Sequence, residues 1–306
     1  MAQWGNFDHV FSFNKKYSYD ARVFEEIISN RKILENQLFA DRLLDLLGVT
    51  GVNTTYPPKT NSDLRSLVDH IVSSELDDHH KQALIYYILK DCRNAPDAAS
   101  QFARSCYLPE KYRLFIEGLW NLDHLQLKRA LDYLSEPSLI PTFPDEILYV
   151  LTIPQIPHRS DSFAITYYLT AAPPLATEKV RQSYFEILCR SSITEAFYFT
   201  RKHDGYNRDR LFVQLVEFVH KTPAGQTRSK RAMEFVGLPL DEDEETRLEE
   251  TLLDGSVSTL PGAKDTLMMR RLATGRLQGL ESLGGKKVDG LNWDDLRESM
   301  KHFQSL

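Results

Sequence analysis

Apolar residues recur at three- and four-residue steps along most of the chain, which is the spacing of one helix face. Between Tyr19 and Leu47 this spacing predicts a continuous helical element, and Gly48 is expected to end it. The Tyr56-Pro57-Pro58 sequence then predicts a rigid connector, because proline fixes its own backbone and restricts its neighbour. Further helical stripes are predicted at residues 64–72, 84–89 and 211–219.

Prolines divide the middle of the chain into short pieces. A proline costs little in the first turn of a helix but about 3 kcal/mol inside one, so these prolines are expected at helix boundaries. No convincing strand is found, since the best candidate, residues 149–156, is interrupted by Pro154 and also fits a helical pattern. The sequence therefore predicts an all-α fold, an irregular α-helical solenoid of stacked helix pairs without a strict repeat.

The composition changes near Gly237, so we expect two parts: a solenoid of residues 1–236 and an extended segment of short jointed helices, residues 237–306. The second part has an acidic run at residues 241–245, a Ser/Gly/Pro linker at 255–262 and five glycines between 274 and 290. Amphipathic segments that form no compact unit of their own often complete their burial against a partner.

Methionine and arginine side by side suit a binding surface, because thioethers adapt to irregular contacts and guanidinium groups donate several hydrogen bonds. A final helix is predicted at about Trp293 to Phe303, with Trp293, Leu296, Met300 and Phe303 on one face. The alternative interpretation is that these helices pack back on the chain's own solenoid. The candidate partner-docking residues are Leu267, Met268, Met269, Arg270, Arg271, Trp293, Leu296 and Met300.

Composition and charge narrow the class of protein. Of 306 residues, 42% are hydrophobic and 26% charged, which is typical of a folded protein, and the net charge of −6 argues against a surface that binds nucleic acid as a whole. Three scattered cysteines form no disulfide framework. The N-terminus lacks a signal peptide pattern, and no apolar run is long enough to cross a membrane. We therefore expect a soluble intracellular protein with no membrane insertion.

Candidate catalytic chemistry is scarce. An isoprenoid-type enzyme would need carboxylates at i, i+1 and i+4 to hold magnesium, but Asp77-Asp78 is followed by Lys81 in the last position. Asp294-Asp295 with Glu298 has the better spacing but stands alone. Both pairs are more readily interpreted as helix N-terminal residues. We predict no catalytic, cofactor-binding or metal-binding residue and no small-molecule substrate.

Other motifs are also interpreted structurally. Cys189 lies in an apolar stripe and is expected to be a buried, inert thiol. The basic cluster of Arg228, Lys230 and Arg231 is more typical of a solvated helix face, although an import signal or a nucleic-acid contact stays open. From pattern alone, the chain is an α-helical scaffold or adaptor.

Eight stretches occur in the order of a known family. Together they resemble the helical domain of the ELYS family of nuclear pore assembly proteins, in the short form found in fungi, over about residues 7–280. The stretches are Phe39–Leu44, Tyr56–Pro58, Ala83–Asp91, Ile116–His124, Ala130–Ile140, Pro173–Leu175, Ser192–Arg201 and Phe235–Asp241.

The resemblance implies a non-enzymatic structural nucleoporin that docks on the Y-shaped scaffold complex and supports pore assembly and the transport of mRNA and protein. The implied partners are Y-complex nucleoporins: the large propeller-solenoid arm subunit and the small β-propeller subunit beside it. The implied location is the nucleus, at the nuclear pore complex of the nuclear envelope, on its nuclear face. Animal members add an N-terminal propeller and a tail with DNA-binding AT-hooks. Neither pattern is found here, so direct DNA binding is not carried over.

Two other classes of function remain as alternatives. One is a generic α-helical adaptor of another intracellular assembly, such as a vesicle coat, which differs from a nucleoporin in its location. The other is the all-α metal-dependent enzyme considered above, which would depend on Asp77 and Asp78.

Overall fold

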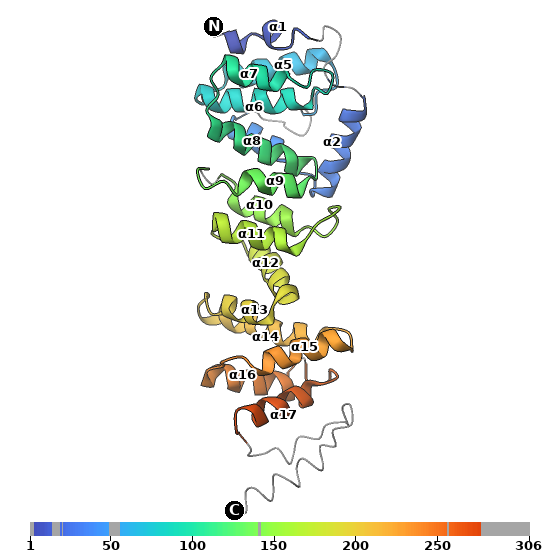
Figure 1. Cartoon of the computed structure of the whole chain (residues 1–306), viewed down its shortest axis with the longest axis vertical. Helices are drawn as coiled ribbons and strands as arrows, with labels where there is room; N and C mark the ends of the chain where they lie inside the picture. Colours follow the sequence, from blue (N-terminus) through green and yellow to red (C-terminus); the bar gives the residue numbers. More distant parts are fainter. Residues whose placement is uncertain are drawn as a thin grey trace, which may run out of the picture. The chain divides into compact units, whose positions relative to one another are not determined.

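The computed structural model describes residues 3–13, 19, 21–48, 56–139, 142–255 and 257–276. In this part of the chain it has sixteen α-helices, one 3-10 helix and no strand, which confirms the all-α prediction (Figure 1). The chain forms two compact units, unit 1 (Met1–Tyr184) and unit 2 (Phe185–Leu306). Among the described residues, no helix is both long and apolar enough to span a membrane.

Unit 1 is built around one almost fully buried helix, α6 (Asp78–Asp91), in which every residue from Gln82 to Leu89 is buried. It packs against four neighbours, and the helices that follow pack as consecutive pairs, α8 with α9 and α10 with α11. The other elements are η1 (Gln3–Gly5), α1 (Phe7–Val10), α2 (Ala21–Ile33), α3 (Phe39–Leu46), α5 (Asn61–Ser73), α7 (Ala98–Ser105), α8 (Glu110–Asp123), α9 (Leu127–Leu134), α10 (Pro144–Thr152), α11 (Asp161–Ala171) and the start of α12 (Glu178–Ser191).

Unit 2 contains the end of α12 and five further helices. The pair α13 and α14 packs together, and α16 and α17 pack on α14 and α15. Phe235, Leu248 and Leu267 come from three of these helices and have 0% exposure, so they share in the core of the unit. The expected division of the chain at residues 236 and 237 falls inside this unit and stays a prediction. The five helices are α13 (Ile193–Thr200), α14 (Gly205–Lys221), α15 (Gln226–Val236), α16 (Glu242–Leu253) and α17 (Ala263–Ala273).

One prediction about the helices is wrong. The apolar stripe from Tyr19 to Leu47 does not form a single helix, because α2 ends at Ile33 and α3 begins at Phe39. Between them, Glu35 and Asn36 adopt left-handed backbone conformations with φ of 55° and 67°. The new helix start is favoured by Asp41, whose Oδ2 accepts a hydrogen bond from Leu38 N at 2.9 Å. The spacing of apolar residues alone does not reveal such a break between two helices.

Several boundary signals in the sequence are confirmed. Pro109 precedes α8 and Pro144 is the first residue of α10, while the first half of the weak strand candidate at residues 149–156 belongs to the same α10. The structure adds a boundary that no proline marks: Ser192 caps α13, since its side chain accepts a hydrogen bond from Glu195 N at 3.2 Å.

Candidate functional site

A buried carboxylate, Asp91, lies at the C-terminal end of α6 and is held by uncharged donors. Its Oδ2 accepts hydrogen bonds from the hydroxyls of Tyr19 at 2.7 Å and Tyr56 at 2.6 Å. Its Oδ1 accepts one from Trp120 Nε1 at 2.8 Å, and His124 Nε2 lies 3.6 Å away. Burial and the Asp91 charge raise the pKa of both tyrosines, so their hydroxyls stay protonated and keep donating.

A second buried carboxylate, Asp123, ends α8 and caps the start of α3. Its Oδ1 accepts from Phe39 N at 2.8 Å, and its Oδ2 accepts from Ala40 N at 2.9 Å and from the Tyr87 hydroxyl at 2.7 Å. Asn30 Nδ2 donates to the Asp123 carbonyl oxygen at 3.0 Å. Burial raises the pKa of Asp123 to about 7 in spite of these three donors to its carboxylate.

An ion pair between Arg31 and Asp41 completes this group. Arg31 Nη2 lies 2.5 Å from Asp41 Oδ1 and also donates to the Tyr56 carbonyl oxygen at 2.8 Å. Arg31 therefore ties α2 to α3 and to the connector before α5. We call the whole set the unit 1 polar network: Tyr19, Asn30, Arg31, Asp41, Tyr56, Tyr87, Asp91, Trp120, Asp123 and His124.

The unit 1 polar network explains what two of the resembling stretches do. Asp91 ends the stretch that begins at Ala83, and Trp120, Asp123 and His124 lie in the stretch that begins at Ile116. The polar atoms of these residues form hydrogen bonds to other groups inside the fold. Their role is therefore to hold helices together and not to bind a substrate. The sequence analysis missed this role. A signal was present, because an aspartate at the C-terminal end of an apolar helix opposes the helix dipole and needs a specific partner.

In unit 2 the acidic run forms a cap and an ion network. Asp241 and Glu244 make a reciprocal capping box, with Glu244 N donating to Asp241 Oδ1 at 2.9 Å and Asp241 N to Glu244 Oε2 at 3.0 Å. Arg201 Nη2 lies 2.7 Å from Glu244 Oε2, and Arg208 Nη2 lies 2.5 Å from Asp241 Oδ2. Burial raises the pKa of Glu244, but hydrogen bonds from both arginines outweigh it and hold the pKa below its usual value.

Arg270, one of the predicted docking residues, is buried in α17. Its Nε and Nη2 donate to Glu245 Oε1 at 3.0 Å and 2.6 Å. Its Nη1 donates to the carbonyl oxygens of Val236 and Leu238, both at 2.6 Å. The Arg270 side chain therefore ties α17 to α16 and to the end of α15 within unit 2.

The other predicted docking residues differ in exposure. Leu267 and Met268 are buried, whereas Met269 and Arg271 are half-buried, and Arg271 Nε donates to Glu249 Oε1 at 3.0 Å. In the structure α17 packs on α15 and α16. This packing is the one that the alternative interpretation, a helix packed back on its own chain, expects. Trp293, Leu296 and Met300 lie outside the described residues, and partner docking by the whole set stays a prediction.

The remaining motifs take structural roles. Asp77 caps α6, because its Oδ1 accepts from His79 N at 3.0 Å and from His80 N at 3.2 Å, and Asp294-Asp295 lies outside the described residues. Cys189 is buried as expected, which raises its pKa to about 12. Arg231 donates to Thr222 Oγ1 at 2.9 Å within unit 2. Among the described residues, no group of three His, Cys, Asp or Glu is placed to hold a metal ion.

Comparison with known proteins identifies the family. The family model for ELYS, described as nuclear pore complex assembly, matches residues 37–255. The chain belongs to the ELYS family. It is 30% identical to the uncharacterized protein ely5 of Schizosaccharomyces pombe over 203 residues, which are 65% of each chain. It is 26% identical to Protein ELYS of Xenopus laevis over 188 residues, 58% of this chain and 8% of that relative. The chain thus spans less than two thirds of either relative.

The ELYS match begins just before α3 and ends just after α16, so the resemblance drawn from the sequence is confirmed. Asp91, Asp123 and Glu244 lie inside the matched range. The predicted docking residues, from Leu267 onward, lie beyond it, as does α1 at the other end.

Proposed function

We propose that this ELYS-family chain is a structural nucleoporin that docks on the Y-shaped scaffold complex of the nuclear pore and has no enzymatic activity. Its neighbours are the large propeller-solenoid arm subunit and the small β-propeller subunit beside it. It acts at the nuclear face of the pore and supports pore assembly and nucleocytoplasmic transport. The observation that carries the proposal is the ELYS match over residues 37–255, which takes in most of the helices of both units.

The physical support comes from how the matched region uses its polar side chains. Asp91, Asp123 and Glu244 are buried carboxylates, and each is held by several donors from other elements of its own unit. Such bonds fix helices in place and leave the outer surface to bind partners. The enzyme alternative would need Asp77 for magnesium, whereas its carboxylate accepts hydrogen bonds from the first turn of α6.

Size-exclusion chromatography of the purified chain with the reconstituted long arm of the Y-complex tests the proposal. We expect co-elution at low salt and at high salt, because an apolar interface is not screened by ions. Separate elution of two folded components at both salt concentrations would contradict it. Localisation of the tagged chain to the nuclear rim separates a nucleoporin from a generic adaptor, which would be found on vesicles or in the cytosol.

The structure also shows which change to the chain can test the C-terminal docking residues. Removing residues 240–306 would take Leu248, Leu252 and Leu267 out of the core of unit 2, so a loss of binding could reflect unfolding. Replacing Trp293, Leu296 and Met300 by alanine changes no residue of a described helix, because the last of these, α17, ends at Ala273. If these residues dock, this triple variant binds the arm more weakly while its thermal unfolding is unchanged.

A further inference from the structure

The turn between α7 and α8 carries a tyrosine in an unfavourable backbone conformation. α7 ends in a Schellman motif, in which Leu108 N donates a hydrogen bond to the Ala103 carbonyl oxygen at 2.9 Å. Tyr107 occupies the left-handed position of this motif, with φ of 55°. Glycine is the usual residue at this position, because a β-carbon makes the left-handed conformation unfavourable. The fold of the turn therefore favours glycine over the tyrosine that is present.

Packing within unit 1 does not explain the Tyr107 side chain. It is 88% exposed, and among the described residues its ring has no aromatic partner and its hydroxyl no hydrogen-bond partner. Leu125, which follows α8 with φ of 57°, is partly buried by contrast, so its side chain takes part in packing. A strained residue whose side chain adds no packing points to a role outside the fold.

A shallow hollow of about 670 Å³ lies beside Tyr107, where the last turn of α7 meets the first turn of α8. Among the residues that line it, Ala103 and Leu108 are apolar and buried. Its two charged lining residues, Arg104 and Arg113, are both basic. The hollow therefore combines an apolar floor, an exposed aromatic ring and positive charge. We call it the α7–α8 corner.

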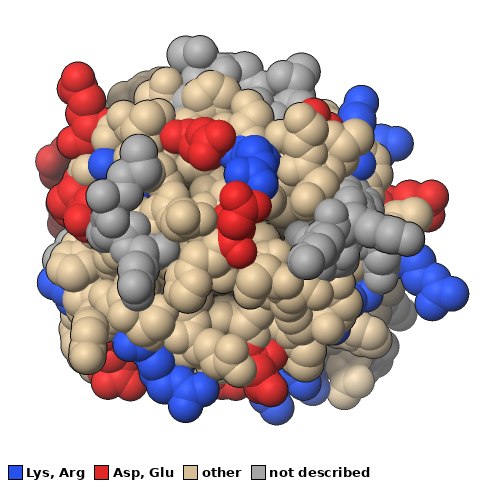
Figure 2. All heavy atoms as spheres, turned by 90° about the horizontal axis from the view of Figure 1, so that it is seen from above, with Lys and Arg blue, Asp and Glu red and all other residues tan. Residues whose placement is uncertain are grey.

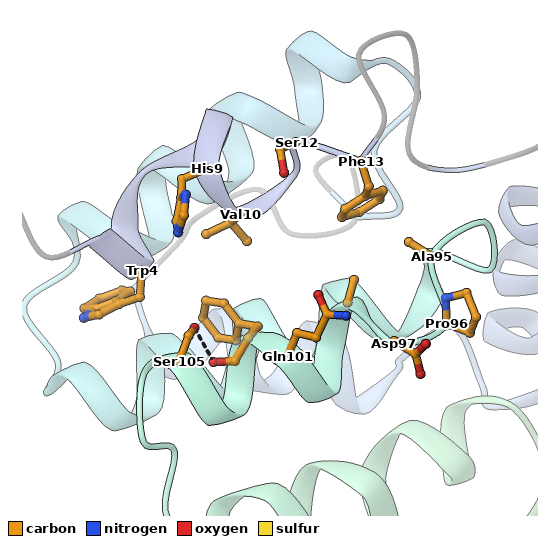
Figure 3. A pocket seen from close by; sticks show the side chains of 12 residues that line it. Trp4, His9, Val10, Ser12, Phe13, Ala95, Pro96, Asp97, Gln101 and Ser105 are labelled. Atoms are coloured by element: carbon orange, nitrogen blue, oxygen red, sulfur yellow. Dashed lines mark hydrogen bonds between the residues drawn. The ribbon is translucent and has the colours of Figure 1, made fainter.

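The neighbouring surfaces of unit 1 have a different character. Figure 2 looks onto the N-terminal end of the unit, where acidic and basic side chains lie next to one another. Figure 3 shows the side of α7 that faces the N-terminal elements, which presents the uncharged Gln101 and Ser105. The α7–α8 corner differs from both surfaces, because the charges that line it have one sign.

The cations of the α7–α8 corner are available to a ligand. Arg104 is exposed and donates through Nε to the Ser100 carbonyl oxygen at 3.2 Å, but it has no acidic partner among the described residues. Lys111, exposed in the first turn of α8, likewise makes no ion pair with a described residue. Arg113 Nη2 lies 3.1 Å from Glu110 Oε1, a solvent-accessible pair of the kind that contributes little stability. Cations without buried partners are complementary to an acidic ligand.

We propose that the α7–α8 corner binds an acidic segment of a scaffold subunit, with an Asp or Glu side chain paired to Arg104 and an apolar side chain packed on the Tyr107 ring. Tyrosine and arginine often dominate binding at protein interfaces, since one offers a large rigid ring and the other several donors. The net charge of −6 disfavours nucleic acid as the ligand. The inference rests on the proposed function, because the segment belongs to the arm of the Y-complex.

Two substitutions of Tyr107 separate binding from folding. Tyr107→Ala removes the ring but keeps the β-carbon, whereas Tyr107→Gly also relieves the backbone strain. We expect each variant to lose about tenfold or more in affinity for the reconstituted long arm, measured by calorimetry. The midpoint of thermal unfolding, measured by circular dichroism, should be unchanged in Tyr107→Ala and raised by about 1–4 °C in Tyr107→Gly. A lowered midpoint in Tyr107→Ala would show that the ring serves the fold and would overturn the inference.

Reversal of one charge tests the acidic nature of the ligand. Arg104→Glu is compared with Arg129→Glu, which makes the same change of charge at another exposed helix position without an ion-pair partner among the described residues. We expect Arg104→Glu to lose about tenfold or more in affinity and Arg129→Glu to keep the wild-type value. The affinity of the wild type should also fall as salt is raised, and that of Arg104→Glu should not.

Three results would count against the inference. Wild-type affinity in Tyr107→Ala or in Arg104→Glu would overturn it and leave the proposed function standing. Binding of a single-stranded DNA oligonucleotide that Arg104→Glu abolishes would also overturn it, because the corner would then serve a nucleic acid. If the wild-type chain does not bind the arm at all, the proposed function fails and this inference fails with it.

Discussion

Apart from Asp41, which pairs with Arg31 in unit 1, the two units hold their buried carboxylates with different kinds of donor. In unit 1, Asp91 and Asp123 accept hydrogen bonds mainly from tyrosine hydroxyls, an indole and backbone amides, all of them uncharged. In unit 2, Glu244 and Glu245 accept theirs mainly from arginine side chains. Uncharged donors cost little to desolvate but leave a carboxylate's charge unbalanced, whereas guanidinium groups balance it and must themselves be desolvated.

The two networks also differ in the distance along the chain that they bridge. The bond from Tyr19 to Asp91 joins residues 72 apart, and that from Phe39 to Asp123 joins residues 84 apart. In unit 2, Arg201 and Glu244 are 43 apart, and Arg270 and Glu245 are 25 apart. The bonds to Asp91 and Asp123 thus fix helices that are distant in sequence. The ion pairs of unit 2, like the Arg31–Asp41 pair of unit 1, join residues that lie closer together along the chain.

The largest expected effect comes from removing the buried cation of unit 2. Arg270→Met keeps an apolar stem but leaves Glu245 without its close partner and the Val236 and Leu238 carbonyl oxygens without a donor. We expect a loss of about 3–5 kcal/mol in the free energy of unfolding, measured by urea denaturation. The double variant with Glu245→Leu removes the stranded charge and should recover much of that loss. A double variant as unstable as Arg270→Met would contradict this account.

The next prediction uses pH to separate the two networks. Burial raises the pKa of Asp123 to about 7, so the folded chain binds more protons than the unfolded chain between about pH 4 and pH 7. The stability contributed by protonated Asp123 is present at the acid end and is lost as pH rises through 7. The lowered pKa of Glu244 acts in the opposite sense, since its contribution is present above the usual glutamate pKa and is lost as pH falls through the folded value.

Unfolding free energies at pH 4.5–7.5 check this difference. We expect Asp123→Asn to remove a decline with rising pH of up to about 1.4 kcal/mol per pH unit, leaving a flatter profile than the wild type. The variant Glu244→Gln should instead remove a loss of stability that the wild type shows below this range, so the profiles of these two proteins are also measured down to about pH 3. Parallel profiles for the wild type and Asp123→Asn would show that Asp123 is ionised in the fold throughout.

Much of the fold follows from apolar spacing and helix-boundary residues, because these are local features. The spacing at residues 64–72 and 211–219 corresponds to α5 and α14, and Pro109 and Pro144 mark helix starts. The break after Ile33 could not be seen in the same way, since the apolar residues keep their spacing while Glu35 and Asn36 turn the backbone. Local chemistry at the turn, and not hydrophobicity, decides that boundary.

The candidate sites were less accessible to sequence reasoning, because their partners lie far apart in the chain. Nothing next to Asp91 reveals that Tyr19 and Tyr56 donate to it. Conversely, the arginine of the Met-Arg stretch looked available for a partner, but Arg270 bonds to Glu245 of the acidic run. The predicted docking stretch and the acidic run thus supply two opposite charges that neutralise each other inside unit 2.

The smallest expected effect comes from removing one uncharged donor of unit 1. Tyr87→Phe deletes the hydroxyl that donates to Asp123 Oδ2 at 2.7 Å but leaves the two backbone donors of α3 in place. We expect a loss of about 1–3 kcal/mol in unfolding free energy, with no change for the control Tyr107→Phe, whose side chain is 88% exposed. Since the hydroxyl also lowers the pKa of Asp123, its removal should extend the pH-dependent decline to higher pH. A loss as large as that of Arg270→Met would contradict the contrast between uncharged and charged donors, because it would mean that one hydroxyl balances the buried charge as strongly as a guanidinium group does.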